Sequence, residues 1–149
     1  MLTIVLIDDD PISTFVTEKL ISKNVKQPCQ FFKYQSAKTA LNEIYQIRPN
    51  YLFLDLNMPE MTGWDFLDNF DSQKNEAEIY ILSSSVDERD INKASKYQVV
   101  KDYLSKPLIK KYIKSIFNWP TGSFFFAFSP TFQLLISLIL CKLNLMKCP

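Results

Sequence analysis

The sequence contains no histidine, only two glycines and only three cysteines among its 149 residues. Without histidine, the chain cannot form a Ser-His-Asp triad, an imidazole general base or most of the zinc sites found in proteins. The cysteines Cys29, Cys141 and Cys148 are odd in number and widely separated, which favours reduced thiols over a disulfide framework. These absences exclude several classes of hydrolase and disfavour a secreted, disulfide-rich protein.

Neither the net charge nor the amino terminus points to nucleic acid or to secretion. Seventeen Lys and Arg residues against sixteen Asp and Glu leave a formal net charge of +1, so no broad positive field would recruit nucleic acid. The first residues lack a basic region and run directly into acids, which does not fit a signal peptide. We therefore expect a cytoplasmic protein that does not bind nucleic acid.

Strand-like and helix-like patterns alternate along the first 118 residues. Five short apolar runs predict strands, and a segment with helical spacing or a helix-capping residue follows each of them. The right-handed crossover rule folds such a repeat into a parallel sheet with helices on both faces. We therefore predict an α/β domain over residues 1–118. Its expected strands are Leu2 to Ile7, Cys29 to Tyr34, Tyr51 to Leu54, Ile79 to Leu82 and Val99 to Leu104.

Capping residues and apolar spacing mark the expected helices. Asp10 precedes Pro11 and is the predicted N-cap of the first helix, and Ser36 is the predicted N-cap of the second. The fourth helix is expected to begin after Asp87 or Asp90. The apolar face of the first helix is expected to consist of Ile12, Phe15, Val16 and Leu20.

Polar residues stand at the ends of four of the five predicted strands. Asp8 and Asp9 follow the first strand, Asp55 the third, Ser83 the fourth and Lys106 the fifth. In open parallel sheets the carboxyl ends of the strands share one edge, and ligands bind there. We therefore expect these side chains to form one site.

The residue types at this edge point to phosphoryl chemistry. Three carboxylates held close together repel one another, and a divalent cation that prefers hard oxygen ligands, Mg²⁺, would keep them ionised. Lys106 offers a positive charge to phosphate oxygens, and the Ser83 hydroxyl offers a hydrogen-bond donor to the same oxygens. Asp55 is the candidate nucleophile, and its attack on phosphorus would give an acyl phosphate.

These residues together resemble the receiver domain of two-component response regulators. The resemblance rests on Asp8-Asp9, the segment 55–63, Ser83 and the segment 103–107, which occur in that order. It covers about residues 1 to 118 and implies a flavodoxin-like (βα)5 fold in a protein of the single-domain type. The function that it implies is a switch of protein–protein interactions in a phosphorelay.

The resemblance also implies a phosphodonor and a metal site. Asp55 would accept a phosphoryl group from a phosphohistidine on a sensor histidine kinase or a histidine phosphotransfer protein. Asp9, Asp55 and the backbone carbonyl of Asn57 would hold Mg²⁺, and Asp8 would reach the ion through water.

The resemblance also implies roles for three further residues. Lys106 would bind the phosphoryl oxygens, Ser83 would turn toward them when Asp55 is modified, and Tyr103 would follow that movement. The switch would act on a downstream protein target. Such a protein is not an enzyme beyond self-catalysed phosphotransfer and autodephosphorylation.

Two alternatives remain at this stage. The first is a Mg²⁺-dependent phosphohydrolase of the haloacid dehalogenase type, which also uses an aspartate at a strand end. Such enzymes place a second aspartate two residues after the nucleophile, whereas this chain has Asn57 there. The second alternative is a receiver-like module that binds partners without being phosphorylated.

The hydrophobic tail, residues 119–149, has a role that the sequence leaves open. No charged residue occurs from Ser115 to Cys141, and residues 120–146 are numerous enough to cross a membrane. Pro120, Gly122 and Pro130 interrupt this stretch, however. Three interpretations compete: a C-terminal membrane anchor, a helix that covers an apolar surface or binds a partner, and a non-native extension from an altered reading frame.

Overall fold

A computed structural model describes residues 1–117 of the chain. The tail lies outside the described residues, and with it the three competing interpretations, among them a membrane anchor through residues 120–146. Within residues 1–117, no helix combines the length and the apolar character needed to cross a bilayer.

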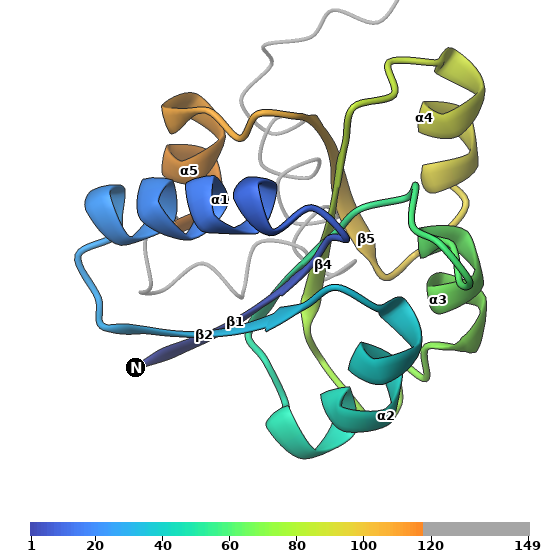
Figure 1. The fold of residues 1–149 in the computed structure, drawn as a ribbon, viewed down its shortest axis with the longest axis horizontal. Helices are drawn as coiled ribbons and strands as arrows, with labels where there is room; N and C mark the ends of the chain where they lie inside the picture. The colour runs from blue at the N-terminus through green and yellow to red at the C-terminus, as the bar shows by residue number, and fades with distance from the viewer. Residues whose placement is uncertain (118–149) are drawn as a thin grey trace, which may run out of the picture. The chain divides into compact units, whose positions relative to one another are not determined.

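Five strands alternate with five helices along the described chain (Figure 1). The first three strands have the predicted bounds, whereas the fourth and fifth end one residue later than predicted. In order, the elements are β1 Leu2–Ile7, α1 Pro11–Asn24, β2 Cys29–Tyr34, α2 Ala37–Ile47, β3 Tyr51–Leu54, α3 Gly63–Asn69, β4 Glu78–Ser83, α4 Glu88–Ala94, β5 Val100–Ser105 and α5 Lys110–Phe117.

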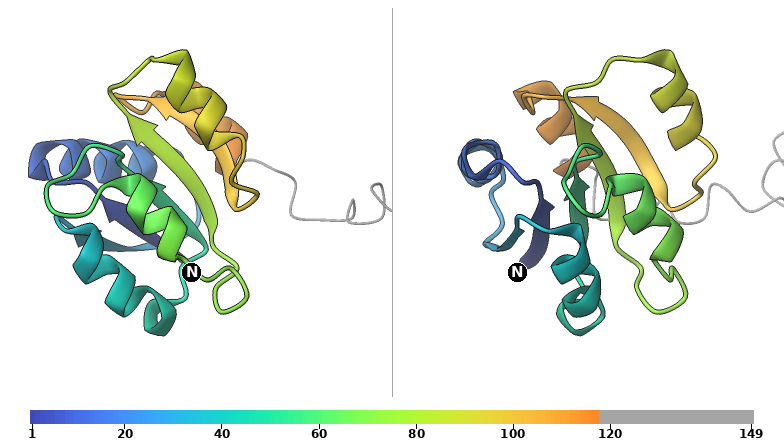
Figure 2. Two further views of the ribbon diagram at one scale, coloured as in Figure 1. Left: turned by 90° about the vertical axis from the view of Figure 1, so that its right-hand side faces the viewer. Right: turned by 45° about the vertical axis from the view of Figure 1, so that its right-hand side comes forward.

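The strands form one parallel sheet in the order β2-β1-β3-β4-β5, which confirms the predicted fold. Helices α1 and α5 lie on one face of the sheet, and α2, α3 and α4 lie on the other (Figure 2). Ile7 of β1 is in register with Leu54 of β3, which pairs in turn with Ile81 of β4. The residues that follow these strands therefore meet at one edge.

The central strand β3 is buried on both faces, as its apolar run predicts. Leu52 and Leu54 pack into the core beneath α2, α3 and α4, whereas Phe53 packs into the core beneath α1 and α5. All three side chains are at most 2% exposed. Because both faces are occupied by apolar side chains, Asp55 at the end of this strand has a rigid support.

Helix α1 is present where the apolar spacing predicts a helix, but the spacing does not identify its buried face. Ile12, Phe15 and Val16 are exposed by 71%, 54% and 39%. Thr14, Thr17 and Ile21 face the sheet instead. The Asp10 side chain accepts hydrogen bonds from the backbone at the helix start, and this cap sets the rotation of the helix about its axis. The apolar residues therefore lie to one side of the buried face.

The predicted caps of α2 and α4 are present. The Ser36 side chain caps α2, and Asp87 rather than Asp90 is the N-cap of α4. Because β4 extends to Ser83, this serine is the last residue of its strand and is fully buried. Its hydroxyl is therefore held within the sheet edge rather than in a loose polar loop.

Candidate functional site

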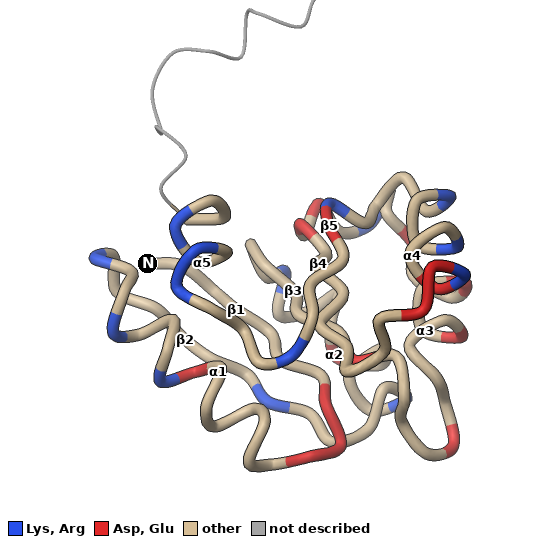
Figure 3. Tube along the Cα trace, turned by 90° about the horizontal axis from the view of Figure 1, so that it is seen from above, with Lys and Arg blue, Asp and Glu red and all other residues tan. Residues whose placement is uncertain are grey.

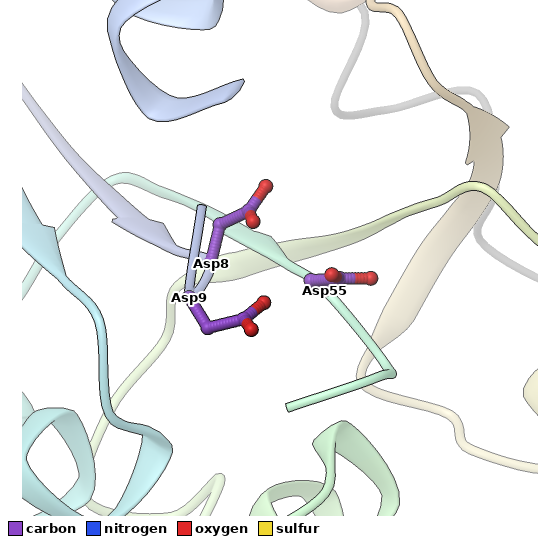
Figure 4. Close-up of side chains that lie close together, drawn as sticks. All are labelled: Asp8, Asp9 and Asp55. Carbon is purple, nitrogen blue, oxygen red and sulfur yellow. The ribbon is translucent and has the colours of Figure 1, made fainter. Parts of the chain in front are cut away.

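Three carboxylates come together at the carboxyl edge of the sheet (Figure 4). Asp8 and Asp9 follow β1, and Asp55 follows β3. One carboxylate oxygen of each residue lies within 4.8 Å of those of the other two. Asp8 and Asp55 are only 5% and 6% exposed, whereas Asp9 is exposed to solvent. The set therefore combines two buried anionic groups with one at the surface.

Lys106 neutralises the two buried carboxylates. Its backbone N–H donates to the carbonyl of Ser83 over 2.8 Å, which continues the pairing of β4 with β5 beyond the last strand residue. Its Nζ lies 2.6 Å from Asp8 Oδ2 and 2.9 Å from Asp55 Oδ2. Burial acts to lower the pKa of Lys106, but the hydrogen bonds to Asp8 and Asp55 outweigh it and raise that pKa. The lysine is therefore a charged ammonium at neutral pH.

The two oxygens of Asp55 have different environments. Oδ1 accepts hydrogen bonds from the backbone N–H groups of Leu56 at 2.7 Å and Asn57 at 3.4 Å. Oδ2 contacts only the Lys106 ammonium among the described residues. The loop thus fixes the orientation of the carboxylate, and a single lysine side chain contacts its second oxygen.

Asp8 is held by a serine that the sequence analysis did not single out. Asp8 Oδ2 accepts a hydrogen bond from the Ser13 hydroxyl at 2.5 Å, and its Oδ1 accepts one from the Asp10 backbone at 3.0 Å. Ser13 lies in the first turn of α1, three residues after the helix cap. Its place in the turn after the acidic cluster does not by itself show that its hydroxyl contacts Asp8.

Gly63 allows the start of α3 to pack directly against the backbone of Asp55. A Cβ at this position would collide with the Asp55 carbonyl oxygen and would lie 2.9 Å from the Cα of Leu56. The Gly63 N–H also donates to the Leu56 carbonyl at 3.0 Å, and a capping box between Thr62 and Asp65 begins the helix. The loop after Asp55 is therefore closed by backbone contacts.

Ser83 and Tyr103 are connected to each other through Ser85. The buried Ser83 hydroxyl accepts a hydrogen bond from the Ser85 backbone N–H at 3.2 Å. The Tyr103 hydroxyl donates to the Ser85 carbonyl at 3.0 Å. The predicted switch pair thus shares one partner, and no contact between either residue and Asp55 is present among the described hydrogen bonds.

The donor set fits a hard divalent cation. Carboxylate oxygens are the ligands that Mg²⁺ and Mn²⁺ prefer, and the three aspartates offer them from within a small volume. The backbone of Asn57 adjoins the same carboxylate, because its N–H donates to Asp55 Oδ1. The chain therefore offers carboxylate oxygen ligands from the ends of two strands.

Comparison with known proteins identifies the family. The model of the response regulator receiver domain matches residues 4–118. A two-component response regulator from Cytophaga hutchinsonii is 30% identical, with a TM-score of 0.70, over 78% of this chain and 93% of its own. None of the curated proteins compared matches the chain.

Two further solved structures share the fold at lower identity. The beryllium fluoride-activated receiver domain of DrrB is 16% identical with a TM-score of 0.65, over 78% of this chain and 93% of its own. The Mn²⁺-bound form of the response regulator Rcp1 is 18% identical with a TM-score of 0.64, and the match covers 100% of this chain and 99% of Rcp1. Together with the matching sheet order and the acidic edge, these findings show that the chain belongs to the response regulator receiver domain family.

Proposed function

We propose that this chain accepts a phosphoryl group on Asp55 from a phosphohistidine and thereby changes which proteins it binds. The observation that carries the proposal is the asymmetry of the Asp55 carboxylate. Oδ1 is held by two backbone N–H groups, whereas Oδ2 faces the ammonium of Lys106. One oxygen is thus positioned for attack, and the cation that would bind the incoming phosphoryl oxygens already touches it.

The transfer step requires little more than positioning. Asp55 Oδ2 forms the new P–O bond while the P–N bond to the donor imidazole breaks, and the imidazole keeps the electron pair and takes up a proton. Lys106 moves its hydrogen bond from Asp55 to the phosphoryl oxygens. The donor is a sensor histidine kinase or a histidine phosphotransfer protein, since the chain itself has no histidine.

Asp9, Asp55 and the Asn57 carbonyl would hold Mg²⁺, with Asp8 reaching it through water. When bound, the ion neutralises charge on the phosphoryl oxygens during transfer. The close approach of the three carboxylates supports this assignment, as does the Mn²⁺-bound form of the related Rcp1. The Lys106 ammonium forms ion pairs with both Asp8 and Asp55.

Ser83 and Tyr103 would act as the switch. Ser83 ends the strand beside β3, so a turn of its hydroxyl toward the phosphoryl group would release the Ser85 N–H. Tyr103 would respond because its hydroxyl is bonded to the same residue. The downstream protein target would read this change at the surface.

Acetyl phosphate with Mg²⁺ and mass spectrometry tests the phosphoacceptor assignment. We expect the wild-type chain to gain the mass of one phosphoryl group and Asp55→Asn to gain none. Glu60→Gln is a matched control, because Glu60 is an exposed carboxylate in the same loop, and it should behave as wild type. Chelation of the metal should suppress the gain.

Other outcomes would favour the alternatives. No mass gain on the wild type, or an equal gain on Asp55→Asn, would leave a receiver-like module that binds partners without phosphorylation. Release of phosphate from many equivalents of a phosphate monoester, which unlike acetyl phosphate is not an acyl phosphate, would favour a phosphohydrolase. Asn57 argues against such turnover, because its amide cannot serve as the acid and base that a second aspartate would provide.

We further propose that the receiver works in the cytoplasm, where phosphohistidine donors present their catalytic domains. Whether residues 120–146 attach it to a membrane is tested by fractionating cells that make the full chain or residues 1–118. Full-length protein that resists alkaline extraction, together with a soluble truncation, would support the anchor. Full-length protein found only in the soluble fraction or in aggregates would contradict it.

A further inference from the structure

We propose that Asp90 is a positioning residue that couples helix α4 to the switch hydroxyl of Ser83, with Ser85 as the intermediate. This inference rests on the proposed function, because it concerns how phosphorylation of Asp55 changes the position of a surface helix. It emerges from the hydrogen bonds of the loop between β4 and α4.

Every polar group of Ser85 is bonded to a different part of the molecule. Its N–H donates to the Ser83 hydroxyl at 3.2 Å, and its carbonyl accepts from the Tyr103 hydroxyl at 3.0 Å. Its own hydroxyl donates to Asp90 Oδ2 at 2.7 Å and accepts from the Asp87 N–H at 3.3 Å. One residue thus joins the end of β4, the aromatic side chain of β5 and the first turn of α4.

The bond between Ser85 and Asp90 is the strong link in this loop. A hydroxyl that donates to a carboxylate makes a charge-assisted bond, and 2.7 Å lies within the usual range for such a contact. Both side chains are partly buried, so water competes less for them than at an open surface. A movement of Ser85 will therefore be passed to Asp90 rather than absorbed by the loop.

Helix α4 has few other attachments at this end. It is seven residues long, and Ala94 is its only buried residue. A helix this short has little stability of its own, so tertiary contacts decide its position. Figure 3 shows acidic and basic residues side by side along it, in keeping with a largely solvated surface.

The opposite end of α4 is attached to α3. The ring of Trp64 stacks on Tyr97 with centroids 5.8 Å apart, and Lys93 Nζ lies 4.3 Å from the Trp64 ring centroid. The Tyr97 hydroxyl also donates to Asp68 at 2.7 Å. Helix α4 is thus held by α3 near its last turn and by Ser85 near its first turn.

These two attachments define how the helix would respond. When the Ser83 hydroxyl turns toward a phosphoryl group on Asp55, the Ser85 N–H loses its acceptor and Ser85 changes position. Because Asp90 is bonded to Ser85, the first turn of α4 moves with Ser85. The contact between Trp64 and Tyr97 keeps the last turn of α4 on α3. The expected motion is a pivot of α4 rather than a displacement of the whole helix.

Hydrogen exchange measured by mass spectrometry, with and without Mg²⁺ and beryllium fluoride, tests this coupling. Beryllium fluoride serves as the probe because it mimics a phosphoryl group on an aspartate. In the wild type we expect changed exchange in residues 55–63 and in residues 86–97. In Asp90→Ala the change at 55–63 should persist and the change at 86–97 should be lost.

Two matched variants separate coupling from simple loss of structure. Asp90→Asn keeps an acceptor oxygen for Ser85 and should restore the change in α4. Glu88→Ala removes an exposed carboxylate from the same turn and should behave as wild type. A response of α4 in Asp90→Ala equal to that of the wild type overturns the inference, as does loss of the response at both segments.

The two proposals fail in different ways. A wild-type chain that responds at 55–63 but not in α4 overturns the role of Asp90 and leaves the phosphoacceptor function intact. A wild-type chain that responds nowhere overturns the phosphoacceptor function, and the role of Asp90 falls with it.

Discussion

Lys106 Nζ and Asp55 Oδ2 lie 2.9 Å apart, which joins the end of the edge strand β5 to the end of the central strand β3. The oxygen that we propose as the nucleophile is therefore the oxygen that the lysine contacts. On phosphorylation the ammonium has to exchange a carboxylate oxygen for a phosphoryl oxygen on the same side chain. Only a small movement is needed, so little reorganisation opposes the transfer.

Lys106→Met should destabilise the metal-free protein and make its stability more dependent on Mg²⁺. The substitution leaves Asp8 and Asp55 as buried anions without their cation, a loss of about 3 kcal/mol by analogy with other broken buried ion pairs. Mg²⁺ should restore part of this loss, because it replaces the missing positive charge. Urea unfolding with and without Mg²⁺ measures both effects.

Lys110→Met is the control for that experiment, since Lys110 is exposed on α5 and has no ion pair among the described residues. Its stability and its response to Mg²⁺ should match those of the wild type. An equal Mg²⁺ effect in Lys106→Met and the wild type would contradict the assignment of Lys106 as the counter-ion of the site.

Gly63→Ala should lower both stability and phosphorylation. The new methyl group would collide with the Asp55 carbonyl, and the neighbouring atoms are backbone that cannot turn aside. Overpacking of this kind costs about 1–3 kcal/mol, and the shift needed to relieve it moves Asp55 itself. Urea unfolding and the rate of mass gain with acetyl phosphate check the two effects, and wild-type behaviour in both would refute the close packing.

Ser83→Ala should remain a phosphoacceptor but lose the response of α4. The alanine leaves the Ser85 N–H without its acceptor, at a cost of about 1 kcal/mol in unfolding free energy. Ser83→Thr keeps the hydroxyl and should retain the response. Hydrogen exchange of residues 86–97 with beryllium fluoride distinguishes the variants; a full response in Ser83→Ala would show that the hydroxyl is not the switch.

The contact between Tyr97 and Asp68 should weaken at high pH. The hydrogen bond to Asp68 and then burial raise the pKa of Tyr97 to about 12, with Asp65 contributing in the same direction. Because the folded pKa lies above the ordinary value of about 10, the contribution is complete below pH 10 and is lost as pH rises toward 12.

Tyr97→Phe isolates this effect, because it removes the hydroxyl and keeps the ring against Trp64. The stability difference between the wild type and Tyr97→Phe should stay constant from neutral pH to about pH 10 and shrink above it. Urea unfolding followed by circular dichroism at a series of pH values gives this difference. A difference that persists unchanged at the highest pH would contradict the raised pKa.

Much of the fold and the site could be predicted because both depend on where strands end. The apolar run of β3 fixed its bounds, and the parallel arrangement then placed Asp55 beside Asp8 and near Lys106. The helix α1 was predicted from its apolar spacing, but its buried face was not, because the rotation of a helix about its axis depends on its cap and on its connection to the preceding strand.

Hydrogen bonds between side chains of different elements could not be predicted from the sequence either. Ser85 and Asp90 are bonded because β4 and α4 are joined by a short loop of one particular conformation. Nothing in the spacing of the two residues signals that bond. Ser13 was missed for the same reason, since its hydroxyl could equally have faced solvent.

The place of Lys106 after the last strand also sets an order of events during synthesis. Asp8 and Asp55 precede residue 56, but the lysine that pairs with both leaves the ribosome some fifty residues after Asp55, at position 106. Until β5 pairs with β4, a nascent chain holds its carboxylates without their counter-ion. If Asp55 is the phosphoacceptor that we propose, a truncated translation product that ends before Lys106 should not accept phosphoryl groups, and should not divert them from the finished protein.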